Sequence, residues 1–243
     1  MIEARQLARR FGKVEAVRDV SFVAPDGAIT GLLGPNGAGK STTLRMLCTV
    51  LRPDSGSARI DGQEVAADPL AARRRIGVLS HASGLYPHLT ARENIVYFGA
   101  LHGLPARERT HRADELIRLL ELGDCADRPA KGFSQGQRLK TALARALVHA
   151  PRNVVLDEPT NGLDVMAVRT LRLLLRRLRD EGCCVLFSSH VMQEVAALCD
   201  EVIVIARGTV VARGTPEALR EQTGEAALED AFVRLIGSGE GLG

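Results

Sequence analysis

The sequence predicts an α/β fold with a mostly parallel sheet, an antiparallel β element and an inserted helical subdomain. Short runs rich in Val, Ile and Leu alternate with longer stretches of helical periodicity, which is typical of parallel sheets covered by helices. A central span, residues 85–150, contains little strand signal. The chain has 243 residues, of which 45% are hydrophobic and 25% charged, which is enough apolar material for a large globular core.

Five short apolar runs are the predicted strands, at residues 28–33, 76–79, 153–156, 183–188 and 201–206. Most of them carry Val, Ile or Leu at consecutive positions, as strands buried on both faces do. The last run continues through Arg207 and Gly208 into residues 209–212. This glycine turn predicts an antiparallel hairpin.

Helical patterns occupy three regions. Within residues 41–51, apolar side chains recur at helical spacing, and Pro53 limits the end. Residues 91–125, interrupted near Pro105, and residues 135–149 predict the helices of the inserted subdomain. We therefore expect a single domain made of a core at about residues 1–84 and 151–215, a helical subdomain at about 85–150 and a C-terminal tail at about 216–243.

The composition argues against several classes of protein. A net charge of +3 and an aromatic content of 3% are unlike a dedicated nucleic-acid binder. No apolar run approaches the ~18–20 residues that cross a bilayer, and the start MIEARQLARRFG lacks the apolar segment of a signal peptide. We therefore expect a cytosolic protein. The five cysteines show no metal-binding spacing, so we expect reduced thiols in the core.

The stretch GPNGAGKST, residues 34–42, fits the phosphate-binding pattern G-x-x-x-x-G-K-[ST] between a predicted strand and a predicted helix. Glycines let backbone N–H groups point at phosphate oxygens, and the helix N-terminus adds partial positive charge. Lys40 can reach the β- and γ-phosphates, and the Ser41 hydroxyl can ligate Mg²⁺. The residues predicted to bind the nucleotide here are Gly34, Pro35, Asn36, Gly37, Ala38, Gly39, Lys40, Ser41 and Thr42.

A second stretch, VVLDE at residues 154–158, ends an apolar strand with two adjacent carboxylates. Ligands of α/β proteins bind at this end of the strands. Asp157 suits a Mg²⁺ site, and Glu158 could polarise an attacking water. Alone, the stretch favours a solvated acidic loop, but the phosphate-binding pattern makes the catalytic interpretation the stronger one.

Two further stretches leave alternatives open. In GFSQGQRLK, residues 132–140, Ser134 and Gln137 fit a capping box before an apolar helix. On the structural interpretation this stretch is only a helix cap. On the functional interpretation the same helix N-terminus is also a second phosphate site. His190 follows the predicted strand at 183–188 and so lies at the same sheet edge, where a structural and a functional histidine are equally good interpretations.

Taken in order, these stretches resemble the nucleotide-binding subunit of ATP-binding cassette (ABC) transporters over nearly the whole chain. GPNGAGKST is similar to the Walker A loop, FSQGQ to the signature LSGGQ, and VVLDEP to the Walker B strand. The residues NGLD at 161–164 resemble the D-loop, and His190 matches the switch histidine. Phe11 falls where the family places an aromatic side chain that stacks on adenine.

The resemblance implies a P-loop NTPase core that binds ATP and Mg²⁺ and hydrolyses ATP within a closed dimer. Ser41 and Asp157 would serve the metal, Glu158 would act as base for water, and His190 would contact the γ-phosphate. The partner copy, or a homologous subunit, would contribute its signature. The signature residues that the resemblance assigns to the nucleotide are Ser134, Gly136 and Gln137, and Asp164 would carry contacts across the dimer.

The resemblance also implies partners and a place in the cell. A separate membrane-spanning permease would be driven from the cytoplasmic face of the membrane, and no nucleic acid is expected as a partner. The residues of the motifs are most similar to those of exporters with separate ATPase and membrane chains, above all to those of sodium-extruding exporters. A soluble ABC ATPase that acts on DNA or ribosomes is one alternative, and a P-loop NTPase outside the family, with FSQGQ only a helix cap, is another.

Two positions depart from the family pattern. Gln135 replaces the first glycine of the signature. His81 stands where the family has the glutamine of the Q-loop, directly after the strand predicted at 76–79. Either His81 contacts the metal's water shell or the γ-phosphate, or it is a spacer without nucleotide contact. The arginines of residues 172–179 alternate with leucines and predict a solvated helix face rather than a nucleic-acid patch.

Overall fold

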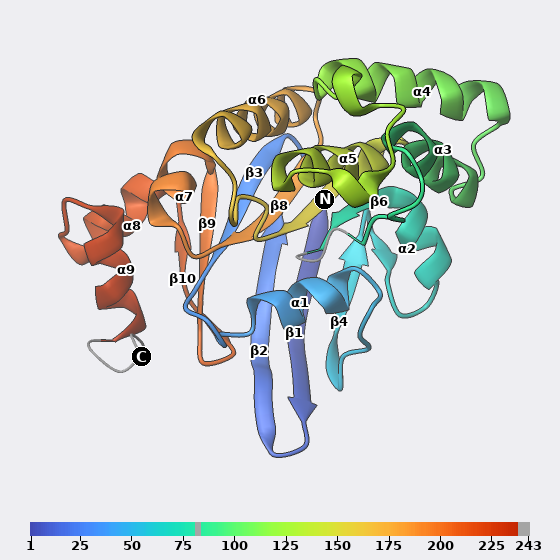
Figure 1. Ribbon diagram of the computed structural model, residues 1–243. Helices are drawn as coiled ribbons and strands as arrows, with labels where there is room; N and C mark the ends of the chain where they lie inside the picture. The colour runs from blue at the N-terminus through green and yellow to red at the C-terminus, as the bar shows by residue number, and fades with distance from the viewer. Residues whose placement is uncertain (81–83, 238–243) are drawn as a thin grey trace.

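The computed structural model describes residues 1–80 and 84–237 (Figure 1). Its described strands form one ten-stranded mixed sheet in the order β5-β4-β1-β2-β10-β9-β3-β8-β7-β6. The strands are β1 (Ile2–Phe11), β2 (Val14–Ala24), β3 (Ala28–Leu33), β4 (Ser55–Ile60), β5 (Gln63–Glu64), β6 (Ile76–Leu79), β7 (Asn153–Asp157), β8 (Cys184–Ser189), β9 (Glu201–Ala206) and β10 (Thr209–Gly214). The mixed α/β architecture predicted from the sequence is confirmed.

Helices cover both faces of this sheet (Figure 1). They are α1 (Lys40–Leu47), α2 (Pro69–Arg75), α3 (Ala91–Leu101), α4 (Ala106–Leu119), α5 (Gln135–Leu147), α6 (Val165–Asp180), α7 (Met192–Leu198), α8 (Pro216–Thr223) and α9 (Leu228–Ile236). In the part of the chain so described, no helix is both long and apolar enough to cross a bilayer.

The central strands are buried on both faces, which explains their continuous apolar runs. In β7, Val154 and Leu156 belong to one hydrophobic cluster while Val155 belongs to the other. The first cluster lies between the sheet and helices such as α5 and α6, and the second includes the side chains of α1 that pack on β1 and β2. Neighbours β3, β8, β7 and β6 are all parallel, as predicted.

The antiparallel part of the sheet is larger than the sequence predicted. Besides the hairpin of β9 and β10, it includes the long pair β1 and β2 together with β4 and β5. These strands have one exposed face, so charged residues interrupt their apolar pattern, and β-bulges break the alternation between Ala4 and Leu7 and at Arg9. Both features hide the period-2 signal on which strand prediction depends.

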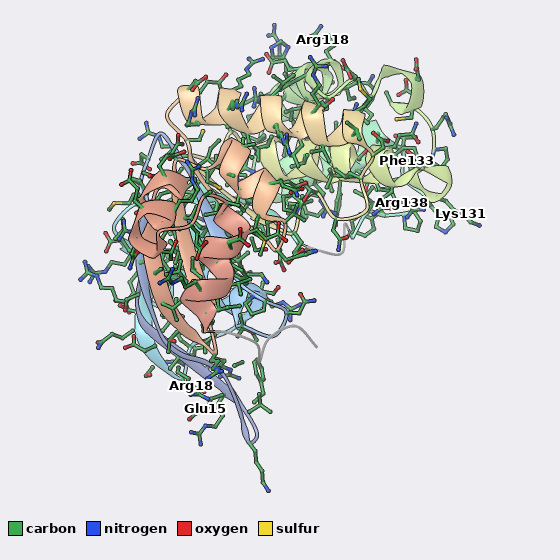
Figure 2. The ribbon with its side chains drawn as sticks, turned by 90° about the vertical axis from the view of Figure 1, so that its left-hand side faces the viewer. Glu15, Arg18, Arg118, Lys131, Phe133 and Arg138 are labelled. Carbon is green, nitrogen blue, oxygen red and sulfur yellow. The ribbon has the colours of Figure 1, made fainter. Side chains whose placement is uncertain are left out.

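The inserted helices α3, α4 and α5 pack together at the end of the sheet that holds β6 (Figure 1). The capping box of Thr90 and Glu93 starts α3, and the chain leaves that helix near Gly103, where φ is +81°. Figure 2 shows Arg118 and Arg138 in this helical part, far from Arg18 near the β1–β2 hairpin. We keep the boundaries at about 85 and 150 as a proposal, and α8 and α9 form the described tail.

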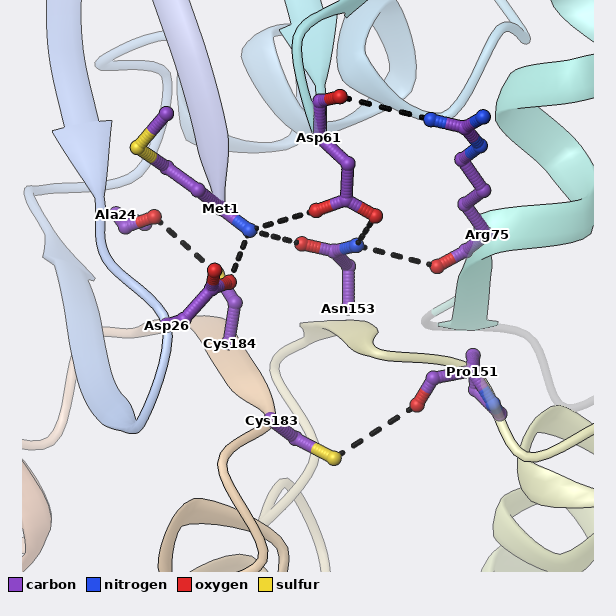
Figure 3. A network of polar contacts seen from close by, with 9 residues as sticks. All are labelled: Met1, Ala24, Asp26, Asp61, Arg75, Pro151, Asn153, Cys183 and Cys184. Atoms are coloured by element: carbon purple, nitrogen blue, oxygen red, sulfur yellow. Dashed lines mark hydrogen bonds and ion pairs between the residues drawn. The ribbon is translucent and has the colours of Figure 1, made fainter.

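A polar network joins the beginnings of β1 and β7 to the end of α2 (Figure 3). The fully buried Asn153 accepts from the Met1 amino group at 2.9 Å, and its amide donates to Asp61 at 2.9 Å and to the Arg75 carbonyl at 3.3 Å.

Nearby, burial raises the pKa of the Cys184 thiol to about 12. All five cysteines are free thiols, as expected.

Two stacked histidines lie where the helical subdomain meets the sheet. The rings of His102 and His149 are parallel within 5°, with centroids 3.5 Å apart. His149 Nε2 lies 3.2 Å from the Ile76 carbonyl at the start of β6, while its Nδ1 is buried without a partner. Burial, aided by the neighbouring His102, lowers the pKa of His149 to about 4. His149 is therefore neutral in the folded protein at neutral pH.

This depressed pKa predicts acid sensitivity. Below the ordinary pKa of 6.5, the unfolded chain binds a proton at His149 that the folded chain does not, so stability is present above pH 6.5 and falls between pH 6.5 and 4. The slope from this one group approaches about 1.4 kcal/mol per pH unit. Urea unfolding of His149→Gln at pH 7, 6 and 5 should show a shallower loss than the unmodified protein. The exposed control His88→Gln should not change the slope; parallel curves for His149→Gln would contradict the assignment.

Candidate functional site

The site forms where parallel neighbours β3, β8 and β7 end. Leu33 is paired with Ser189, and Asp157 with Ser188, so the three strands finish at nearly the same level. The stretch at residues 34–42, the two carboxylates at the end of β7 and His190 after β8 therefore lie at one edge. This is the edge on which the sequence placed its candidates.

Close backbone contacts shape the loop between β3 and α1. A Cβ at Gly34 would lie 2.3 Å from the Ile205 carbonyl, and one at Gly39, where φ is +107°, would lie 2.5 Å from the Ala16 carbonyl. The Gly208 N–H donates to the Ala38 carbonyl at 3.0 Å. Glycine is therefore required at both positions because β9 and β2 press against the loop, which places its N–H groups at the start of α1.

Lys40 is the first residue of α1 and is only 5% exposed. Its ammonium donates to the Gly34 carbonyl at 2.6 Å and to the Pro35 carbonyl at 3.1 Å, and it lies 3.8 Å from Glu158 Oε1. Burial lowers the pKa of Lys40, while the carboxylates of Glu158 and Asp157 act in the opposite direction. The Lys40 side chain thus bends back over the loop, and its ammonium can contact an anion that the loop binds.

Ser41 and Asp157 provide a set of oxygen atoms suited to Mg²⁺. The Ser41 hydroxyl donates to Asp157 Oδ1 at 3.0 Å, and Asp157 is only 8% exposed. Mg²⁺ prefers hydroxyl, carboxylate and water oxygens and keeps several waters. The hydroxyl and the carboxylate are therefore the kinds of ligand that this ion takes.

Ser188 is a site residue that the sequence analysis missed. It is fully buried, and its hydroxyl donates to Asp157 Oδ1 at 2.7 Å. The Ser188 Oγ also accepts from the Glu158 N–H at 3.0 Å. Ser188 thus holds both carboxylate residues in place. The local sign is that Ser188 and Ser189 end the apolar run of β8, whereas the pairing of Ser188 with Asp157 belongs to the tertiary structure.

Glu158 lies at the centre of the site. Its backbone is left-handed, with φ +52°, a conformation that costs free energy for a residue other than glycine and is concentrated at functional sites. Its carboxylate receives His190 Nδ1 at 2.5 Å on one oxygen and faces Lys40 with the other. The imidazole remains partly exposed. A carboxylate between an imidazole and an ammonium can accept a proton from water while its own orientation is fixed.

The signature stretch begins α5 with a complete capping box. The Ser134 hydroxyl accepts from the Gln137 N–H at 3.2 Å, and the Gln137 side chain accepts from the Ser134 N–H at 3.0 Å. Arg138 fastens the preceding turn by donating to the Phe133 and Lys131 carbonyls (Figure 2). The predicted cap is confirmed, and Ser134 itself stays exposed to solvent.

The remaining candidates have separate local surroundings. Asp164 caps α6 by accepting from the Ala167 N–H at 2.8 Å. Phe11 ends β1 and is 45% exposed, and the Arg9 guanidinium lies 5.2 Å from the centroid of its ring. His81 lies outside the described residues. The nucleotide contacts of Phe11, Gly136 and Asp164 stay predictions.

Comparison with known proteins agrees with this geometry. A family profile described as ABC transporter matches residues 17–161. The ABC transporter ATP-binding protein NatA of Bacillus subtilis strain 168 is 42% identical over 241 residues, which cover 97% of this chain and 98% of NatA. The daunorubicin/doxorubicin resistance ATP-binding protein DrrA of Streptomyces peucetius is 40% identical over 227 residues, covering 93% of this chain and 69% of DrrA.

Solved structures show the same fold. A structure described as an ATP-binding subunit of an ABC transporter superposes with a TM-score of 0.90 at 29% identity, covering 98% of this chain and 100% of that one. The dimeric post-hydrolysis structure of the ATP-binding cassette MJ0796, bound to ADP and Pi, gives a TM-score of 0.79 at 27% identity, covering 88% and 98%. The chain therefore belongs to the ABC transporter family, and within it to the ATP-binding subunits.

Proposed function

We propose that this chain hydrolyses ATP as the peripheral subunit of an exporter and drives a separate membrane-spanning permease from the cytoplasmic face of the membrane. The printed names of its relatives support export, since they include drug resistance proteins and the Nod factor export ATP-binding protein I of Burkholderia lata. The similarity to NatA makes a sodium-type cargo one candidate among these. The relatives named here are described as transporter, drug resistance or export ATP-binding proteins, and none of these descriptions mentions DNA or ribosomes.

The observation that carries this proposal is the position of the Glu158 carboxylate between Lys40 and His190. Glu158 would deprotonate the attacking water, and His190 would hold that carboxylate in place from the other side. Lys40 would exchange its carbonyl partners for phosphate oxygens and neutralise their charge. Phosphoryl transfer needs mainly this kind of positioning and charge compensation.

Mg²⁺ would be held by Ser41 and Asp157, with Ser188 orienting the carboxylate. The ion would supply charge neutralisation at the phosphates when bound. The loop from Gly34 to Thr42 would bind phosphates through its N–H groups, and Phe11 would contact the base. His81 would contact the phosphate or the metal's water shell.

A second copy of the chain, or a homologous subunit, would complete each site with Ser134, Gly136 and Gln137. The exposed Ser134 at the N-terminus of α5 supports this, because the N-terminus of a helix attracts anions. Two solved structures of one relative, the ATP-binding cassette MJ0796, are described as dimeric. Asp164 would then lie at the beginning of α6 as a contact between copies.

The arginine-rich helix α6 supports no nucleic-acid role. Its leucines Leu171, Leu174 and Leu175 are buried, whereas Arg176 and Arg177 face outward, and Arg177 pairs with Glu181 at 2.8 Å. The basic residues therefore form the solvated face of an amphipathic helix, as predicted.

The first test replaces the proposed base. Glu158→Gln keeps the shape of the side chain but cannot accept the proton, so ATP hydrolysis should fall about 100- to 1000-fold while MgATP binding persists. Steady-state phosphate release and equilibrium ATP binding measure the two effects, and size-exclusion chromatography with ATP should show a stable dimer. The surface control Glu217→Gln should hydrolyse normally, and normal turnover of Glu158→Gln would remove Glu158 as the base.

The second test separates capping from phosphate contact at Ser134. Ser134→Asn retains a good N-cap but loses the hydroxyl, whereas Ser134→Ala loses both. If Ser134 contacts phosphate in the partner's site, both variants should lose most ATPase activity. A Ser134→Asn protein with full activity, in a sample shown to dimerise, would mean that the serine is only a cap.

The third test concerns the permease. When the chain is tagged and expressed from its native locus, a polytopic membrane protein should co-purify in detergent, and ATPase activity should rise when the pair is reconstituted in liposomes. Recovery with ribosomes or DNA in place of a membrane protein would contradict the exporter proposal.

A further inference from the structure

The side chain of Gln135 makes a contact that the usual signature glycine cannot make. Gln135 is the first residue of α5, and its Nε2 donates to the Asn161 carbonyl at 3.0 Å. Asn161 lies in the loop between β7 and α6, 26 residues further along the chain. The bond therefore joins the helical subdomain to the loop that follows the candidate base Glu158.

Gly162 is shaped to accept this side chain. Its backbone has φ +71°, and a Cβ there would lie 2.3 Å from Gln135 Nε2 and 3.0 Å from Gln135 Cδ. The amide of Gln135 thus lies directly against the loop backbone. Only a residue without a Cβ leaves it that space.

Two successive hydrogen bonds connect the Gln135 side chain to the backbone of Glu158. The N–H of Asn161, whose carbonyl accepts from Gln135, donates to the Glu158 carbonyl at 3.2 Å. Thr160, between them in the loop, donates its hydroxyl to Glu194 of α7 at 2.5 Å. The loop is therefore held on one side by the core and on the other by Gln135.

A cavity of about 260 Å³ lies beneath this contact. Gln135 and Arg138 line it from α5, while Asp157, Glu158 and Asn161 line it from the end of β7 and its loop. With this space between the two parts, Gln135 is a direct polar link between α5 and the loop.

We propose that Gln135 is a positioning residue that tethers the 159–164 loop to α5 within one chain. The tether holds the loop and the backbone of Glu158 in the arrangement that ATP-driven closure requires. This role rests on the proposed ATPase function, whereas the tether itself is a property of the free subunit.

Three variants of the full-length chain test the tether. Gln135→Gly restores the usual signature residue, so any loss cannot come from a damaged signature. Gln135→Glu keeps the size but has no donor for the Asn161 carbonyl. Gly162→Ala displaces the Gln135 amide without changing Gln135, and it also strains the loop backbone at φ +71°, so it serves only as the background for the double variant.

Amide hydrogen exchange of the nucleotide-free subunit is the first measurement. Peptides covering residues 159–164 should exchange about 2- to 10-fold faster in both Gln135 variants, the range expected for loss of one hydrogen bond. Peptides from α9 are the internal control and should not change. Unchanged exchange in the loop of Gln135→Gly and Gln135→Glu would overturn the tether, whether or not the protein is an ATPase.

Steady-state ATPase kinetics test the positioning role. We expect KM for ATP to rise about 3-fold in Gln135→Gly, with a smaller change in kcat, because closure has lost part of its preorganisation. The double variant Gln135→Gly/Gly162→Ala should be no worse than Gly162→Ala alone, since the two changes break one contact. Faster loop exchange with unaltered KM and kcat, or additive effects in the double variant, would overturn the positioning role. An unmodified protein without ATPase activity would instead refute the proposed function.

Discussion

The site depends on the parallel register of β3, β8 and β7. Because Asp157 is paired with Ser188 across β7 and β8, and Leu33 with Ser189 across β3 and β8, three loops distant in sequence begin at one level. A shift of one residue would turn Asp157 and Ser188 to opposite faces of the sheet. The large apolar side chains on both faces, such as Phe187, make such a shift costly, so the hydrophobic core sets the geometry of the charged site.

The charges of the site stabilise one another in the absence of nucleotide. An isolated buried ammonium or carboxylate is costly, and Lys40 and Asp157 are both almost completely buried. Lys40 is satisfied by two loop carbonyls and by the nearby Glu158, while Asp157 is satisfied by the hydroxyls of Ser41 and Ser188. Nucleotide binding to such a site exchanges one set of polar partners for another. The free energy of binding is therefore the difference between two states in which the charged groups are all paired. The charge of the phosphates determines how far this difference favours the bound state.

The sequence predicted those elements and site residues that have a local pattern, and it missed those that depend on contacts between distant segments. Strands β3, β6 and β9 match the predicted residues because strands buried on both faces leave unbroken apolar runs. Strands β1 and β2 escaped prediction because their exposed faces and bulges break that pattern. Local motifs located the loop at 34–42, the two carboxylates and His190, since each motif is continuous in sequence. Ser188 and the bond from Gln135 to Asn161 depend on tertiary pairing, which a local pattern does not encode.

Helix α5 contacts the core at both of its ends, and the two contacts differ in kind. At its C-terminal end the backbone lies against β6, where a Cβ at Gly77 would be 2.4 Å from the Ala146 carbonyl, and His149 contacts the Ile76 carbonyl within the buried seam. At its N-terminal end one contact with the core is the exposed bond from Gln135 to Asn161. The helical subdomain is therefore joined to the core by close backbone packing at the C-terminal end of α5, whereas a solvent-exposed hydrogen bond is among its contacts at the N-terminal end.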